Sequence, residues 1–113
     1  FAPPRPLERI FARDRGRIVP IATRTIEHVE GCDDYVAIVA GGRRHLVNLR
    51  MNELESRLDP HRFVRVHRSH IVNLDYVAAL VPFDGVRLAV EMRDGTRIRA
   101  SRERSKALRE MVR

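Results

Sequence analysis

The sequence predicts a mostly β fold with mainly antiparallel sheets, one short internal helix and a C-terminal helix. Short runs rich in β-branched and aromatic residues recur along its 113 residues, which is typical of strands. Glycine-containing turns separate several neighbouring runs and favour hairpins, so these strands should pair antiparallel. Two segments carry apolar residues at helical spacing, and they are the two predicted helices.

Residues 1–16 are predicted to be a linker or N-terminal extension, and residues 17–113 to be the domain itself. Three of the first six residues are Pro, and a stretch of mixed charge follows. Its apolar residues Leu7, Ile10 and Phe11 leave open a short helix packed on the edge of the domain. The chain begins with Phe1 rather than Met, so we expect it to be a fragment of a longer protein.

The predicted strands of the first half are residues 17–25, 26–30, 35–40 and 44–49. Pro20 has no N–H to donate, which places it on a sheet edge. Gly41-Gly42-Arg43 predicts a hairpin turn between the last two strands. Apolar residues then recur at positions 51, 54 and 58 before Asp59-Pro60, which predicts a short helix over residues 51–58.

The predicted strands of the second half are residues 63–66, 71–73, 76–81, 86–92 and 96–100. Asp84-Gly85 and Asp94-Gly95 predict turns, because Gly tolerates positive φ at little steric cost. Ser101 is the predicted N-cap of the C-terminal helix. The apolar stripe of this helix is predicted to be Ala107, Leu108, Met111 and Val112.

Composition favours one domain that needs no covalent staples. Apolar residues make up 43% of the chain, and Cys32 is its single cysteine, so no intramolecular disulfide and no CxxC zinc knuckle is present. The simplest compartment is therefore a reducing cytoplasm. No stretch is long and apolar enough to span a membrane.

Charge points to a polyanionic partner. The formal net charge is +7, with ten Arg against nine acidic residues over 1–60 and eleven Arg plus Lys106 against six over 61–113. A positive field concentrated in one half attracts phosphate polyanions. Arg outnumbers Lys by 21 to one, which suits bidentate contacts to guanine and phosphate, although a genome rich in G and C would give the same bias.

The segment His67-Arg68-Ser69 is the strongest candidate for a binding site. It lies between two predicted strands, which would hold its donors and cations rigidly at a turn. A metal site is not expected, because His67 and His70 should point to opposite faces of an extended segment. Ser69, His67 and Asp75 lack the elbow and oxyanion loop of a hydrolase, so we expect neither an enzyme nor a cofactor.

An RNA-binding or protein-interaction β-module is the alternative function. Basic β-folds often bind RNA, but six aromatic residues are too few for a stacking platform, and Tyr35, Phe63 and Tyr76 occupy predicted core positions.

Residues from about 17 to 112 resemble the LytTR DNA-binding domain, the output module of a class of bacterial response regulators. The resemblance rests mainly on residues 63–73, Phe-Val-Arg-Val-His-Arg-Ser-His-Ile-Val-Asn, with Asp94-Gly95, Ala100-Ser101-Arg102 and the loop at residues 30–36 in support. It implies an elongated stack of small sheets whose loops enter successive major grooves of double-stranded DNA. The sequence offers no pair of helices spaced as in a helix-turn-helix, which agrees with loop-based recognition.

The resemblance also implies which residues face DNA: Asp34 or Tyr35, then His67, Arg68 and Ser69, and finally Ser101, Arg102 and Arg104. Arg68 is the candidate for base readout, with phosphate binding as the alternative. Ser101 and Arg102 could form a phosphate clamp or a plain helix cap. Asp33 and Asp34 depart from the expected pattern, because acids repel phosphates. Two copies would occupy tandem half-sites as a homodimer controlled by an upstream receiver or sensory domain.

Overall fold

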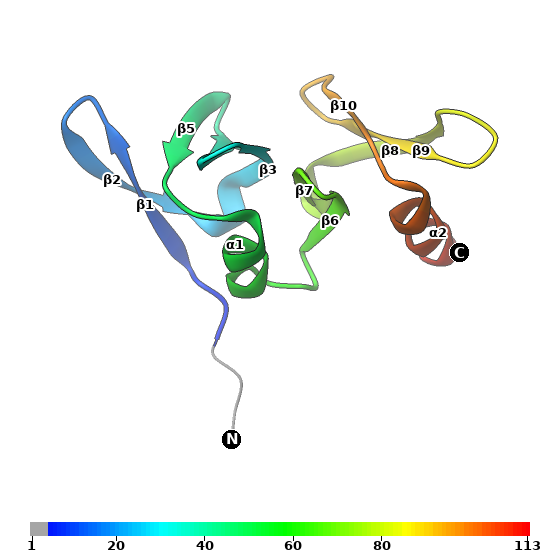
Figure 1. Ribbon diagram of the computed structural model, residues 1–113, viewed down its shortest axis with the longest axis horizontal. Coiled ribbons are helices and arrows are strands. Elements are labelled where there is room, and N and C mark those ends of the chain that lie inside the picture. Colours follow the sequence, from blue (N-terminus) through cyan, green and yellow to red (C-terminus); the bar gives the residue numbers. More distant parts are fainter. Residues whose placement is uncertain (1–4) are drawn as a thin grey trace.

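The fold is mostly β, as predicted. The computed structural model describes residues 5–113 and contains three antiparallel sheets arranged along the long axis of an elongated molecule (Figure 1). The principal extents are 46 × 38 × 25 Å. The strands are β1 (Arg9–Asp14), β2 (Arg17–Ala22), β3 (Ile26–Cys32), β4 (Tyr35–Ala40), β5 (Arg43–Val47), β6 (Phe63–His67), β7 (His70–Asn73), β8 (Val77–Pro82), β9 (Leu88–Met92) and β10 (Arg97–Arg99). The helices are α1 (Met51–Arg57) and α2 (Arg102–Glu110), with 3-10 turns at Thr23–Thr25 and Leu74–Tyr76.

A five-stranded sheet, in the order β5-β4-β3-β7-β6, forms the centre of the molecule. The predicted hairpin of β4 and β5 turns at Gly41 and Gly42, whose φ values of 59° and 75° are the left-handed pair that a tight two-residue turn requires. The helix predicted over residues 51–58 is present as α1, and Leu54 on its inner face is fully buried.

Residues 9–14 have regular secondary structure. These residues form β1, which pairs antiparallel with β2 through a turn at Arg15 and Gly16 (φ 52° and 78°). Ile10 and Ala12 alternate with exposed neighbours and are buried in the core, so the segment has strand periodicity rather than that of the alternative helix. Pro20 lies in this two-stranded sheet, in register with Phe11. The proposed domain boundary at residue 17 stays a prediction.

A three-stranded sheet, in the order β10-β9-β8, carries α2 at the other end of the molecule. Both Asp-Gly turns are present, but only Gly95 uses a positive φ, 92°. The other turn is built on the Asp84 carboxylate, which accepts the N–H groups of Val86 (2.8 Å) and Arg87 (2.6 Å).

The predicted apolar stripe of the C-terminal helix is largely wrong. Helix α2 ends at Glu110, so Met111 and Val112 lie beyond it and are 47% and 66% exposed. Leu108 alone of the four packs in the core. The second inward position is Ser105, whose buried Oγ accepts the N–H of Leu88 at 2.9 Å and so fastens α2 to β9.

Two hydrophobic cores meet at the hairpin of β6 and β7. Phe63 and Ile71 belong to the core beneath α1, whereas Val66 and Val72 belong to the core beneath α2. Adjacent strand residues face opposite sides of a sheet, so Ile71 and Val72 anchor β7 in both cores at once. The turn at the tip of this hairpin is therefore held from both sides.

Candidate nucleic-acid interface

The tip of the β6–β7 hairpin presents Arg68 to solvent. His67 and His70 are paired across the turn, and the Nδ1 of His67 accepts the N–H of Ser69 at 3.2 Å. The Ser69 hydroxyl lies 3.0 Å from the Nδ1 of His67 and 3.1 Å from the Nδ1 of His70. Arg68 is exposed. The neighbours of Arg68 thus bond to each other within the turn, while its guanidinium is available to a ligand.

The prediction that His67 and His70 point to opposite faces is wrong. The chain reverses between them, which brings their rings together in an edge-to-face contact with centroids 5.8 Å apart. Within residues 5–113, no group of three or more His, Cys, Asp or Glu side chains is arranged to hold a metal ion.

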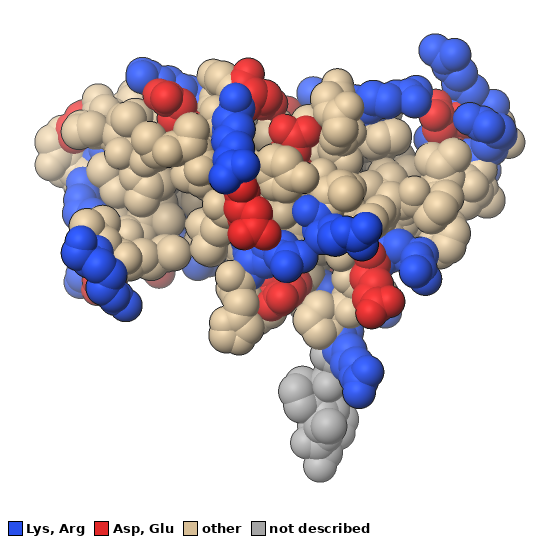
Figure 2. All heavy atoms as spheres, turned by 180° about the vertical axis from the view of Figure 1, so that it is seen from behind, with Lys and Arg blue, Asp and Glu red and all other residues tan. Residues whose placement is uncertain are grey.

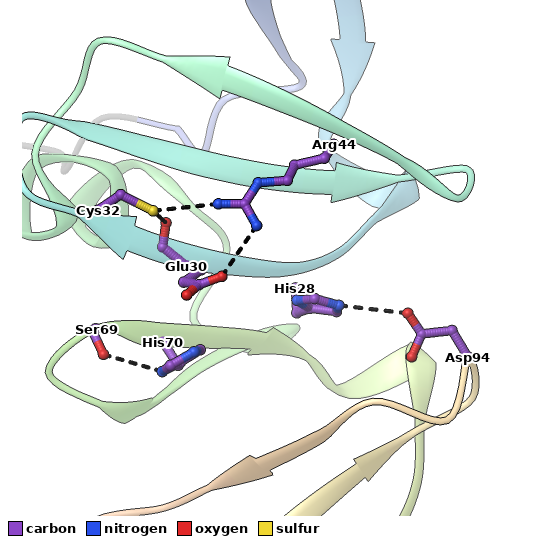
Figure 3. A network of polar contacts seen from close by, with 7 residues as sticks. All are labelled: His28, Glu30, Cys32, Arg44, Ser69, His70 and Asp94. Carbon is purple, nitrogen blue, oxygen red and sulfur yellow. Dashed lines mark hydrogen bonds and ion pairs between the residues drawn. The ribbon is translucent and has the colours of Figure 1, made fainter.

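His70 is held toward its neutral form. Burial lowers the pKa of His70, and the nearby imidazoles of His67 and His28 lower it further, while the Glu30 carboxylate opposes them. Figure 3 shows Ser69 and His70 below Glu30 of the adjacent strand. The turn therefore carries its positive charge on Arg68 rather than on His70.

The loop between β3 and β4 lies beside this turn. The Gly31 N–H donates to the Ser69 carbonyl at 2.8 Å, and Asp33 adopts a positive φ of 26°. Asp34 and Tyr35 line a solvent-open hollow of about 1110 Å³ together with Arg68 and Ser69. Tyr35 was predicted to pack in the core, but it is 40% exposed on the wall of this hollow. Phe63 is buried as predicted, and Tyr76 is half-buried.

The start of α2 lies on the opposite side of Arg68. Ser101 caps the helix as predicted, with its Oγ accepting the Arg104 N–H at 3.2 Å. The Ser101 N–H donates to the Val66 carbonyl at 2.9 Å, which fixes α2 against β6. Ser101 and Arg104 line a second hollow of about 430 Å³ with His67 and Arg68.

Seven of the eight predicted interface residues thus line two hollows, which share Arg68 and its neighbour on β6, Arg65. Asp34, Tyr35 and Ser69 line the first hollow, and His67, Ser101 and Arg104 line the second. The eighth predicted residue, Arg102, is exposed at the first position of α2 and lines neither of these two hollows.

The lining of the first hollow includes Arg50, Asn52 and Arg65, which can donate hydrogen bonds and were not predicted. Arg65 lines the second hollow as well. Arg65 lies inside the motif on which the resemblance rests, three residues before Arg68, and this position in the sequence could have indicated that it belongs to the site. Arg50 and Asn52 lie at the start of α1, more than ten residues before the turn, and short-range patterns do not reveal that contact.

The charge around the hollows is mixed. Asp33, Asp34 and Glu53 line the first hollow and Glu103 the second. Figure 2 likewise shows Lys and Arg side chains spread along one face with acidic groups between them. Such a surface attracts polyanions overall, but the acidic side chains repel phosphate at particular points, which a continuous basic patch would not do.

A contact between two polar side chains connects the central sheet to the three-stranded sheet. His28 on β3 is 8% exposed, and its Nε2 lies 3.6 Å from the Asp94 carboxylate in the turn after β9 (Figure 3). Hydrogen bonds from Thr96, its backbone N–H first, lower the pKa of Asp94, and His28 contributes a smaller effect in the same direction. The pair helps to fix the sheet that carries α2 relative to the hairpin that carries Arg68.

Comparison with known proteins identifies the family. The family model described as "LytTr DNA-binding domain" matches residues 16–113. The chain belongs to the LytTR family of DNA-binding domains. The LytTR domain is a DNA-binding module and not an enzyme family. Strand β1 precedes the matched region and therefore lies outside the part of the chain that the family model describes.

Two relatives of this LytTR domain are heme-containing CO-sensing transcriptional regulators of Paraburkholderia xenovorans, RcoM 2 and RcoM 1. They are 37% and 36% identical over 110 residues, which is 96% of this chain and 41% of each relative. The sensory transduction protein LytT of Bacillus subtilis is 28% identical over 95 residues, covering 84% of this chain and 39% of LytT. The chain therefore spans about two fifths of the length of these relatives.

The fold is also that of a solved LytTR domain. The LytTr domain of a putative methyl-accepting/DNA response regulator from Bacillus cereus superposes with a TM-score of 0.85 at 21% identity. The match covers 92% of this chain and 95% of that one. No helix among residues 5–113 is long and apolar enough to cross a membrane.

Proposed function

We propose that this LytTR domain recognises a defined double-stranded DNA sequence by placing connecting segments in the major groove. The observation that carries the proposal is the position of Arg68, which lines both hollows and so joins the β3–β4 loop to the start of α2. A site made of three segments on a rigid frame can contact bases and phosphates together.

Each segment has a proposed role. The Arg68 guanidinium reads a guanine edge through two hydrogen bonds, because it is exposed and its turn is fixed from both sides. Arg104, Arg102 and the first N–H groups of α2 hold phosphate, since the helix start favours negative charge. In the β3–β4 loop, Asp34 accepts from a cytosine amino group, with the exposed Tyr35 beside it.

In the full-length protein, we propose that this domain is the output module of a cytoplasmic transcriptional regulator. The names of the relatives, two CO-sensing transcriptional regulators and a sensory transduction protein, support an attached receiver or sensory domain. Two linked copies would occupy tandem half-sites, so that a modest affinity of each domain becomes sufficient when both engage.

Selection of bound duplexes from a random pool tests this function. We expect one enriched sequence whose binding survives moderate salt better than binding to random duplex or single-stranded RNA. Equal binding to all duplexes, or preference for RNA, would contradict sequence-specific recognition of DNA and favour the alternative RNA-binding module.

Arg68→Ala and Arg102→Ala separate base readout from phosphate binding. Loss of one bidentate base contact should cost about 1–3 kcal/mol on the selected duplex and flatten the preference at one base position. Arg102→Ala should weaken binding to selected and random duplexes by the same factor. Titrations of both variants against both duplexes measure this, and equal losses for Arg68→Ala would reject the readout role.

A further inference from the structure

Arg65 lies inside the basic interface, yet its side chain faces the protein. It projects from β6, and the side chain is 14% exposed. One terminal nitrogen, Nη1, donates to Asn52 Oδ1 and to Glu55 Oε1 (3.1 Å), both on α1. The other, Nη2, donates to the backbone carbonyl of Arg68. The guanidinium therefore bridges α1 and the tip of the hairpin.

Little of this guanidinium remains for DNA. Glu55 compensates its charge, its Nε is buried, and both terminal nitrogens have acceptors within the protein. A phosphate contact would require Arg65 to give up its ion pair with Glu55 and its bonds to Asn52 and to the Arg68 carbonyl. Arg68, by contrast, is exposed at the tip of the same hairpin.

The second carbonyl of the tip is held as well. Ser69 O accepts the Gly31 N–H of β3 at 2.8 Å, so both consecutive carbonyls are bonded, that of Arg68 by Arg65 of the same hairpin and that of Ser69 by the adjacent strand. A turn whose backbone is fixed at both residues presents its side chain in one direction. Such support is what a base-reading side chain needs, because small misplacements lose its hydrogen bonds.

We propose that Arg65 is a positioning residue, which aims Arg68 at the DNA by tying the Arg68 carbonyl to α1 through Asn52 and Glu55. The inference rests on the proposed function, since it assigns Arg65 a part in sequence recognition. In this proposal, α1 supports the interface, and the positive charge of Arg65 pairs with Glu55 rather than with a DNA phosphate.

Arg65→Ala tests the proposal through the ratio of affinities for the selected and random duplexes. Positioning predicts that this ratio falls by at least about fivefold, the lower end of what one bidentate base contact discriminates. It also predicts an unchanged salt dependence on random duplex. A direct phosphate contact instead predicts equal losses on both duplexes and a salt slope smaller by about 0.9, and that result would overturn the proposal.

Two further variants keep the test independent of charge. Arg65→Lys retains the positive charge but not the planar fork, so positioning predicts no rescue of the ratio, whereas a phosphate contact predicts substantial rescue. Asn52→Ala changes no charge and should lower the ratio in the wild-type background. Combined with Arg65→Ala, it should lower the ratio no further, because Asn52 acts through Arg65.

Hydrogen exchange tests the same idea without DNA. In folded Arg65→Ala, the Gly31 N–H that bonds to the tip should exchange faster than in the wild type, while the Leu88 N–H bonded to Ser105 should be unchanged. Unchanged exchange at Gly31 would contradict the bridge. If the wild type shows no sequence preference, the proposed function fails; if it does and the Arg65→Ala ratio is unaltered, this inference alone fails.

Discussion

Asn73 is a fully buried polar residue at the base of the β6–β7 hairpin, whose turn carries Arg68. Its Nδ2 donates to the Ile26 carbonyl at 2.8 Å, and its Oδ1 accepts the Asp75 N–H at 2.9 Å. The sequence does not reveal the strand that Asn73 bonds, because Ile26 is 47 residues away.

Replacing Asn73 by Ala should destabilise the fold. The Ile26 carbonyl and the Asp75 N–H would each lose a partner, and one such buried unsatisfied group costs about 1–3 kcal/mol. Urea unfolding measures the change in the free energy of unfolding. Asn48→Ala, at an exposed position, is the control and should change it by less than about 0.5 kcal/mol. Equal effects of the two substitutions would contradict the role of Asn73.

His70 should make stability depend on pH in the mildly acidic range. Its folded-state pKa is lowered, first by burial, so the unfolded chain binds the proton more readily than the folded chain does. The contribution of His70 is therefore fully present above the unfolded-state pKa near 6.5 and is lost as the pH falls through that value toward the folded-state pKa.

Urea unfolding at pH 7.5 and 5.5 measures this contribution. The wild type should lose more of its free energy of unfolding between the two pH values than His70→Gln does, because Gln carries no titrating proton. His45→Gln, on β5 and in a different part of the sheet, is a matched control. A drop in His70→Gln as large as that of the wild type would assign the pH effect to other groups.

At the scale of elements, local patterns predicted most strands and both helices but missed β1. The Pro-rich start and the many charges resemble a linker, and Phe11 points outward at 59% exposure, which hides the alternation of Ile10 and Ala12. The stripe of α2 was misjudged for a related reason. Buried Ser105 satisfies the N–H of Leu88, and such a partner cannot be inferred from hydrophobic spacing.

The end of β3 and the start of α1 pack closely at Gly31. A Cβ on Gly31 would lie 2.8 Å from Met51 Cγ, so Met51 would have to move. Gly31→Ala should reduce the free energy of unfolding by about 1–3 kcal/mol, the usual cost of overpacking. It should also weaken DNA binding, because Gly31 bonds to the Ser69 carbonyl.

Gly85→Ala is the matched control for this prediction. Nothing lies within 4 Å of a Cβ at position 85, and Gly85 has no positive φ. Its stability should be unchanged or slightly higher, because Ala restricts the unfolded chain. Thermal unfolding of the two variants compares them directly, and a Gly31→Ala variant as stable as Gly85→Ala would show that Met51 yields without cost.

At the scale of the whole molecule, the interface depends on the two cores that meet at β6 and β7. The turn with Arg68 lies between them, with the β3–β4 loop on the side of one core and α2 on the side of the other. The resemblance found in the sequence predicted which three segments face DNA, but it did not predict how far apart these segments lie in space. Bringing residue 34 and residue 104 to either side of residue 68 is a long-range result of sheet packing.

Mapping the DNA-contacting surface by backbone amide chemical shifts tests this arrangement most directly. On titration of the domain with its selected duplex, the largest shift changes should fall together in residues 33–35, 67–70 and 101–104. The β1–β2 turn at Arg15 and Gly16 should stay unaffected, although it too is basic. Changes confined to one of the three segments, or centred on the β1–β2 turn, would contradict a single surface organised around Arg68.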